Sequence, residues 1–395
     1  MKLIFIFLST LCLASCGSGG GTSISNINNI EVESKYDHPY LKISEVAIFN
    51  NIDVESVIIN PVSHNKYKKG LFTVSTNTKS FIIQLKAGKT SSVRFLTLID
   101  PNGFEYIIED DIHDFSLNKY FKQGWGSLSS LQFPVFSKNE VVAGEWEYTL
   151  ASKHGISIVE VDLEVLLIER IHEISLRPTI TVEPIISSDV FTSEEVLEGL
   201  ELTKEFFNNY NISLEIDPTV TLIDSQKSIT IGQSRVVADS EILLKGNKNK
   251  IRIFFVDKFS YQAYLQKDDE PLGLASGVPA FQGQSYNNYI LINFFYLMNK
   301  DGSLDIEELS GALSHEIGHY LGLSHTIEKK GDQFDLLSDT LECDILKDSD
   351  GDGEVSAFEC KDNGGYNLMF WGGSRGKHYM TPQQFFIIQH SPIVE

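Results

Sequence analysis

Residues 315–325 read H-E-I-G-H-Y-L-G-L-S-H, and this stretch decides how most of the chain is interpreted. His315 and His319 are four residues apart, so a helix places both imidazoles on one face, where a single Zn²⁺ can bind both. Glu316 lies about 100° further round the helix. That position makes Glu316 a poor third ligand and a well-placed base for a water molecule at the metal.

The glycine at position 322 supplies the turn that such a site needs. Glycine adopts the left-handed conformation that ends helices without steric cost, so the chain can turn back at Gly322 and return His325 to the metal. Three imidazoles leave the fourth position of a tetrahedral zinc ion open, which is typical of catalytic rather than structural sites. The alternative is an ordinary amphipathic helix with hydrogen-bonded histidines, but the extended pattern makes a chance match rare.

The string resembles the HExxHxxGxxH zinc motif of the metzincin metalloproteases. That resemblance implies a methionine-containing turn beneath the three histidines, and the turn with Met369 in Asn367-Leu368-Met369 is similar to it. Ser338-Asp339-Thr340 and Cys343 precede this turn, and Thr381-Pro382-Gln383-Gln384 follows it. Their order resembles the pappalysin and cytophagalysin branch, which includes the ulilysin-type enzymes. The resemblance covers about residues 177–395.

The resemblance implies a zinc endopeptidase that cleaves proteins or peptides, with Glu316 as general base. A catalytically silent surface binding or adhesion protein is the alternative, although binding alone has no use for a base beside the metal. The chain departs from the family at Trp371, because the family usually carries a Tyr two positions after the Met. An indole has no phenolic donor, so that role is empty or falls to Tyr366 or Tyr379.

The N-terminus, residues 1–15, is interpreted as an export signal: Lys2 precedes an apolar run that is too short to span a bilayer. Leu13-Ala14-Ser15-Cys16 resembles the bacterial lipobox, which implies cleavage before Cys16 and a diacylglycerol on its thiol. An ordinary signal peptide with an incidental cysteine is the alternative. We expect residues 16–36 to form a flexible tether, and the protein to be exported and lipid-anchored at the outer membrane or cell surface.

The two remaining cysteines, Cys343 and Cys360, are expected to form a disulfide, because an exported protein meets an oxidising compartment. Two buried thiols are the alternative. Between them, residues 348–359 read D-S-D-G-D-G-E-V-S-A-F-E, which fits an EF-hand calcium loop. The expected ligands are the carboxylates of Asp348, Asp350, Asp352 and Glu359 and the backbone carbonyl of Glu354. A solvated acidic loop without an ion is the alternative.

The formal net charge of −22 argues against nucleic acid as a partner and against adhesion to anionic membrane surfaces. A lipid anchor is therefore the one membrane contact expected. The chain of 395 residues exceeds one typical core, which favours two domains. The sequence leaves the substrate and the oligomeric state undetermined.

The expected fold class is α+β. Short alternating strands such as 80–85 and 144–150 predict an N-terminal antiparallel β-sandwich over residues 37–172, faintly similar to jelly-roll accessory domains. A metzincin-like α/β zinc protease domain is expected over residues 177–395. We expect a capping box at Thr192 and a nearly all-apolar central strand at 251–256. We also expect an edge strand beside the substrate cleft at 273–279 and the zinc helix at 305–321.

Overall fold

The computed structural model describes residues 41–49, 55–60, 63–87, 92–109, 119–122, 128–153, 163–188, 190–223, 228–231, 243, 245–247, 249–261, 271–280, 288–372 and 378–395. All of them belong to one compact unit, Val32–Glu395. The expected signal peptide, the lipidated Cys16 and the tether lie outside the described residues. Within the described ranges, no helix has the length and apolar character needed to cross a bilayer.

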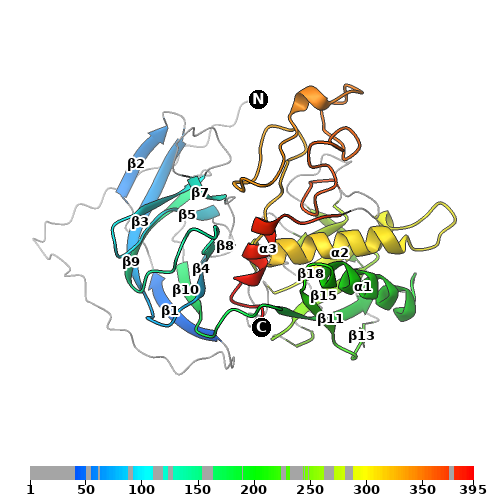
Figure 1. The fold of residues 1–395 in the computed structure, drawn as a ribbon, viewed down its shortest axis with the longest axis horizontal. Helices are drawn as coiled ribbons and strands as arrows, with labels where there is room; N and C mark the ends of the chain where they lie inside the picture. The colour runs from blue at the N-terminus through cyan, green and yellow to red at the C-terminus, as the bar shows by residue number, and fades with distance from the viewer. Residues whose placement is uncertain are drawn as a thin grey trace, which may run out of the picture. The chain divides into compact units, whose positions relative to one another are not determined.

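The first part of the chain forms two β-sheets that face each other (Figure 1). The four-stranded sheet is antiparallel and has the order β1 (Leu41–Phe49), β10 (Leu163–Arg170), β4 (Ser80–Ala87) and β8 (Leu128–Phe133). The six-stranded sheet has the order β2 (Glu55–Asn60), β3 (Ser63–Val74), β9 (Gly144–Lys153), β5 (Ser92–Ile99), β6 (Glu105–Glu109) and β7 (Lys119–Lys122).

Aromatic side chains fill the space between these sheets. The ring of Trp146 on β9 lies 5.2 Å from those of Phe81 and Phe133, which belong to the other sheet. Such edge-to-face pairs stabilise a core beyond the burial of their area. The pair β6–β7 is parallel, whereas the sequence predicted antiparallel pairing throughout. Alternation of side chains along one strand does not reveal the direction of its neighbour.

The second part contains a mostly parallel sheet of the order β12 (Ser213–Ile216), β11 (Thr179–Ser187), β15 (Ile251–Val256), β18 (Ile290–Asn293) and β17 (Gly273–Ala275). The short strand β13 (Thr221–Leu222) also pairs with β11, and β14 (Ser228–Ile231) pairs with β16 (Lys258–Tyr261) in a separate parallel ribbon. All six residues of β15 are buried, which confirms its predicted central place. Strand β17 pairs antiparallel with β18 and is the last strand of the described sheet at that end.

Among the described residues of this part, the α-helices are α1 (Ser193–Asn208), α2 (Ile306–Tyr320) and α3 (Pro382–Gln389), and they are accompanied by the 3-10 turns η2 (Phe294–Tyr296) and η3 (Ile345–Lys347). Helix α1 begins with the predicted capping box at Thr192, and a second box at Thr381 opens α3. The Asp305 side chain caps α2. Figure 1 shows α1 and α2 side by side along the sheet, where Gly199 allows the Leu309 side chain to approach α1.

The two parts share buried side chains. The hydrophobic cluster that contains α1 and α2 also includes Ile82 and Ile168 from the four-stranded sheet. The Gln132 amide on β8 donates a hydrogen bond of 2.7 Å to the carbonyl oxygen of Ile387 on α3. Strand β8 is therefore fixed against the part of the chain that carries the histidine motif.

Candidate active site

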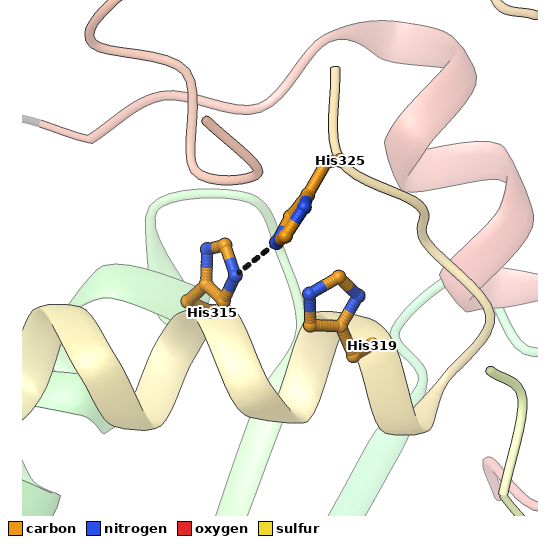
Figure 2. A group of neighbouring side chains, drawn as sticks. All are labelled: His315, His319 and His325. Carbon is orange, nitrogen blue, oxygen red and sulfur yellow. Dashed lines mark hydrogen bonds between the residues drawn. The ribbon is translucent and has the colours of Figure 1, made fainter. Parts of the chain in front are cut away.

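Helix α2 and the turn after it bring the three motif histidines together (Figure 2). One ring nitrogen from each of His315, His319 and His325 lies within 4.8 Å of the other two. The Nε2 atoms of His315 and His325 are 3.2 Å apart. Two nitrogen ligands of a tetrahedral zinc ion lie about 3.4 Å apart, given zinc–nitrogen bonds of about 2.05 Å, so this spacing fits that metal.

Each ring also has a hydrogen-bond acceptor on its other nitrogen. The Nδ1 atoms of His315 and His319 lie 2.7 Å from the backbone oxygens of Leu368 and Leu323. These oxygens only accept, so both Nδ1 atoms carry the proton and both Nε2 atoms keep a lone pair. Partners of this kind orient histidine ligands at metal sites. The donor set therefore fits a divalent cation that prefers nitrogen.

The third ring follows the same pattern: the Nδ1 of His325 lies 3.1 Å from the Glu328 carboxylate. Burial, together with the neighbouring His325, lowers the pKa of His315 to about 3. A neutral imidazole is the form that binds a metal ion. The cluster is thus arranged to offer three neutral nitrogens to one point.

Gly322 makes the return of His325 possible. Its φ is +106°, a left-handed conformation that side chains rarely adopt. The Leu323 amide then donates to the Gly318 carbonyl at 2.9 Å, which satisfies one of the last carbonyls of α2. The helix ends where the sequence predicted, and the chain reverses toward the two histidines on its face.

Glu316 follows His315 on α2, and its side chain lies against the edge strand β17. Its carboxylate accepts a hydrogen bond from the Ala275 amide, and its side chain contacts the backbone of Gly273. Burial raises the pKa of Glu316 to about 8, and the Ala275 hydrogen bond opposes this rise. A cation beside the carboxyl group would also lower the pKa. The group is a buried carboxyl next to, but outside, the nitrogen cluster, as suits a proton carrier.

Met369 lies beneath helix α2. Its side chain is fully buried, and its sulfur is 2.6 Å from the position that a Cβ on Gly318 would take. Its carbonyl oxygen accepts a hydrogen bond of 2.9 Å from the Thr326 amide, next to His325. The methionine therefore packs between the helix and the third-histidine segment, while its neighbour Leu368 orients His315.

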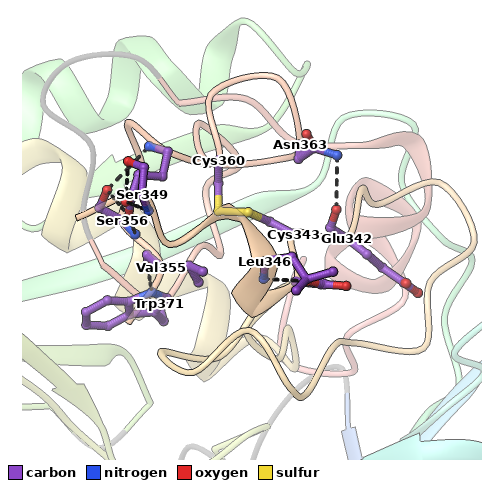
Figure 3. Close-up of a disulfide and its surroundings, with 11 residues drawn as sticks. Glu342, Cys343, Leu346, Ser349, Val355, Ser356, Cys360, Asn363 and Trp371 are labelled. Carbon is purple, nitrogen blue, oxygen red and sulfur yellow. Dashed lines mark hydrogen bonds between the residues drawn. A yellow bond between two sulfur atoms is a disulfide. The ribbon is translucent and has the colours of Figure 1, made fainter. Parts of the chain in front are cut away.

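Trp371 takes no part in this cluster. Its indole N–H donates to the Val355 carbonyl at 2.7 Å, and the Lys329 ammonium lies 5.5 Å from its ring centre (Figure 3). The side chain thus packs near the disulfide. The Tyr379 phenol hydrogen-bonds to the Asn367 side chain, and the Tyr379 amide donates to the Tyr366 carbonyl at 3.1 Å.

Two residues near the site were missed by sequence reasoning. Glu328 follows His325 by three residues, and that spacing was a usable signal. His378 lies far along the chain but packs against Gly311, one helical turn before His315. Its Nε2 is 2.6 Å from the position that a Cβ atom on Gly311 would take. His378 also contributes to lowering the pKa of His315. No local pattern in the sequence marks His378.

Cys343 and Cys360 form the expected disulfide, with their Cα atoms 5.7 Å apart (Figure 3). Together with Ile327, Val355 and Phe370 they make a small buried cluster, which the Trp371 ring contacts. The segment between the cysteines is thereby attached to the residues that follow His325.

The acidic loop brings some of its expected ligands together. Carboxylate oxygens of Asp348, Asp350 and Asp352 lie within 4.8 Å of one another. Glu359 instead accepts hydrogen bonds from the backbone amides of Ser349 and Ser356, which lower its pKa to about 2. The Glu354 carboxylate pairs with Lys329 at 2.7 Å.

Scans against protein-family models and against curated protein sequences find no match to this chain. Among solved structures, similarity is found to metalloproteinase-II from Bacteroides fragilis, with 12% identity and a TM-score of 0.32, over 55% of this chain and 54% of that one. The chain thus spans about half the length of that protein. Archaemetzincin from Methanopyrus kandleri has 10% identity and a TM-score of 0.30, over 54% of this chain and 95% of its own. Archaemetzincin from Archaeoglobus fulgidus has 15% identity and a TM-score of 0.23, over 37% and 80%.

Proposed function

We propose that this chain is a zinc-dependent endopeptidase of the metzincin type. The observation that carries the proposal is the three-histidine cluster: two of its rings donate Nδ1–H to a backbone oxygen, the third has a carboxylate there, and the remaining nitrogens meet at one point. The residue after His315 on the same helix, Glu316, carries a buried carboxyl group. A protein that only binds a ligand could use the histidine cluster but has no need of the Glu316 carboxyl group. Hydrolysis of a peptide bond needs the cluster and the carboxyl group together.

The chemistry divides between the metal and the protein. Zinc supplies a Lewis acid and brings the pKa of a bound water to about 7. His315, His319 and His325 would hold the ion. Glu316 accepts the proton of the attacking water and passes it to the leaving amine. The Ala275 amide holds the carboxylate in place for both transfers.

The edge strand supports a peptide as substrate. Strand β17 is paired on one side only in the described sheet, and it lies against Glu316. Its open edge can add an extended peptide as a further strand through main-chain hydrogen bonds. Binding of this kind reads backbone rather than side chains, so a segment within a longer protein is as suitable as a free end.

We further propose that the enzyme belongs to the pappalysin branch. Asp339 accepts hydrogen bonds of 2.9 Å from the Thr381 hydroxyl and the Gln383 amide. These residues belong to the two segments that resemble that branch, and their contact supports a shared arrangement around the Met-containing turn. Independently of the branch, we propose a structural calcium ion at Asp348, Asp350 and Asp352.

The location of the enzyme follows from its N-terminus. We propose export, lipidation at Cys16 and attachment at the outer membrane or cell surface, on the sequence alone. The substrate would then be a periplasmic or extracellular protein.

A quenched-fluorescence peptide library tests the function. The mature protein should cleave it, a zinc chelator should stop cleavage, and added zinc should restore it. Glu316→Gln should keep one zinc per chain but lose about 100- to 10,000-fold in kcat/KM. Glu307→Gln, an exposed glutamate of the same helix, is the matched control and should keep activity. Wild-type activity in Glu316→Gln would disprove the assigned base.

A further inference from the structure

A pocket lies beside the histidine cluster, between strand β8 and the turn that ends helix α2. It encloses about 60 Å³, several times the space that one water molecule needs. Its walls come from four places: β8 with the two residues after it, the turn after β17, the chain before and after His325, and Ile387 on α3. The lining residues used below are Gln132, Val135, Val278, Gly322, Ser324 and Leu337.

The pocket adjoins the proposed metal site. Gly322 follows His319 by three residues, and Ser324 directly precedes His325. Val278 lies three residues beyond Ala275, whose amide binds Glu316. Three residues of a fully extended chain span about 10 Å, and residues 276–279 bend and turn after β17, so Val278 lies within that distance of Ala275. A peptide paired with β17 at Glu316 therefore reaches the pocket no more than about three residues from the scissile bond.

The walls are rigid and mostly apolar. Gln132 is 5% exposed, and its hydrogen bond to Ile387 fixes the β8 wall against α3. Across the pocket, the amide of Ala280, two residues after Val278, donates to the Tyr320 carbonyl at the end of α2. Valine, leucine, isoleucine and proline residues make up most of the remaining lining, and Ser130 and Asp335 add polar groups. A mostly apolar pocket of this size favours an aliphatic side chain, and the Asp335 carboxylate disfavours an acidic one.

We propose that this pocket is a subsite for an aliphatic side chain of the peptide substrate, and that the N-terminal β-sheets determine specificity through it. This inference rests on the proposed peptidase function. The proposed subsite gives the N-terminal β-sheets a defined role, because β8 supplies one wall of the substrate-binding region. The second part of the chain would lack this wall without them.

Two substitutions on the β8 wall test the proposal in opposite directions. Val135→Trp fills the pocket and should lower kcat/KM about tenfold or more for peptides with Leu, Ile or Val at one position, no more than about three residues from the cleaved bond. Val135→Ala enlarges the pocket and should raise the relative rate for Phe or Met at that same position. The wild-type library profile identifies which side of the bond this position is on.

Val141→Trp is the matched control. Val141 is also a partly buried valine beside the aromatic core, but it does not line the pocket. The Val141→Trp variant should leave the preference for the substrate side chain unchanged. Zinc content and the melting temperature establish that each variant is folded, and a reporter peptide with alanine at every position near the bond measures basal cleavage.

The outcomes separate this inference from the function beneath it. Absence of cleavage by zinc-loaded wild type would refute the peptidase itself. Normal cleavage with an unchanged profile in folded Val135→Trp and Val135→Ala would refute only the subsite. If Val135→Trp fails to fold, an unchanged profile in Val135→Ala still overturns the proposal.

Discussion

Replacing Gly273 by alanine is expected to damage catalysis without touching a metal ligand. The added Cβ would lie 2.5 Å from the Cγ and 2.8 Å from the Oε1 of Glu316. Gly273 is not among the glycines with positive φ, so its backbone accepts alanine. The three atoms nearest to the new methyl group all belong to the Glu316 side chain, which must move.

The size of this effect can be worked from the contact. Carbon atoms pack at about 3.5 Å or more, so Glu316 must shift by about 1 Å. The shift stretches or breaks the hydrogen bond that Glu316 accepts from the Ala275 amide. Ala275 lies two residues after Gly273 on β17. A misplacement of about 1 Å in a catalytic group costs about 100-fold in rate, or about 2.7 kcal/mol.

The assay compares kcat/KM, bound zinc and melting temperature for Gly273→Ala, Glu316→Ala and the double variant. Gly273→Ala should lose about 100-fold in kcat/KM and keep its zinc. In the Glu316→Ala background the same change should have no further effect, because the carboxylate that it displaces is absent. Leu274→Ala is the control. Leu274 lies on the same strand but packs against a hydrophobic cluster that does not include Glu316, so its replacement should leave activity unchanged.

Full activity of folded, zinc-loaded Gly273→Ala would refute the reasoning, since it would mean that the position of Glu316 against β17 does not matter. An equal additional loss in the Glu316→Ala background would refute it in another way. The methyl group would then act on substrate binding at the strand edge rather than on the carboxylate.

Other features of the site lead to shorter predictions. Glu328→Ala removes the carboxylate beside the Nδ1 of His325 and should weaken zinc binding about 10- to 100-fold, measured by chelator competition; unchanged affinity would contradict that role. Replacing Cys343 and Cys360 by serine should reduce the free energy of unfolding by about 3 kcal/mol in urea titrations, and a smaller loss would show that the loop is held otherwise. Calcium should raise the melting temperature of the wild type but not of Asp350→Asn; no rise in either would exclude the calcium proposal.

Local sequence patterns predicted much of the second part of the chain. The zinc helix was expected at 305–321 and is found at Ile306–Tyr320, because the Asp305 cap and Gly322 mark its ends by their own chemistry. The central strand β15 matches its prediction residue for residue. In each case the information lies within one element: a hydrogen-bonding cap, a left-handed glycine or an unbroken apolar run.

Features that depend on contacts between distant segments could not be predicted in this way. The side-chain position of Trp371 follows from the Val355 carbonyl, which the disulfide segment brings near. The amides that bind Glu359 lie ten and three residues before it, and the calcium pattern specifies ligands rather than these competing donors. The approach of β8 to Gly322 links residues separated by almost half of the chain, and neither segment carries a signal for the other.

The same distinction holds inside the proposed metal site. The motif places the three rings on one side of the helix, but a ring becomes a ligand only when its other nitrogen is held. For His315 the holding group is the Leu368 carbonyl, 53 residues along the chain. That carbonyl reaches the ring because Met369 packs against Gly318, where any larger residue would meet its sulfur. The methionine thus acts by setting the distance between turn and helix. Its contribution is steric, and it depends on a glycine inside the motif that makes no bond to the metal at all.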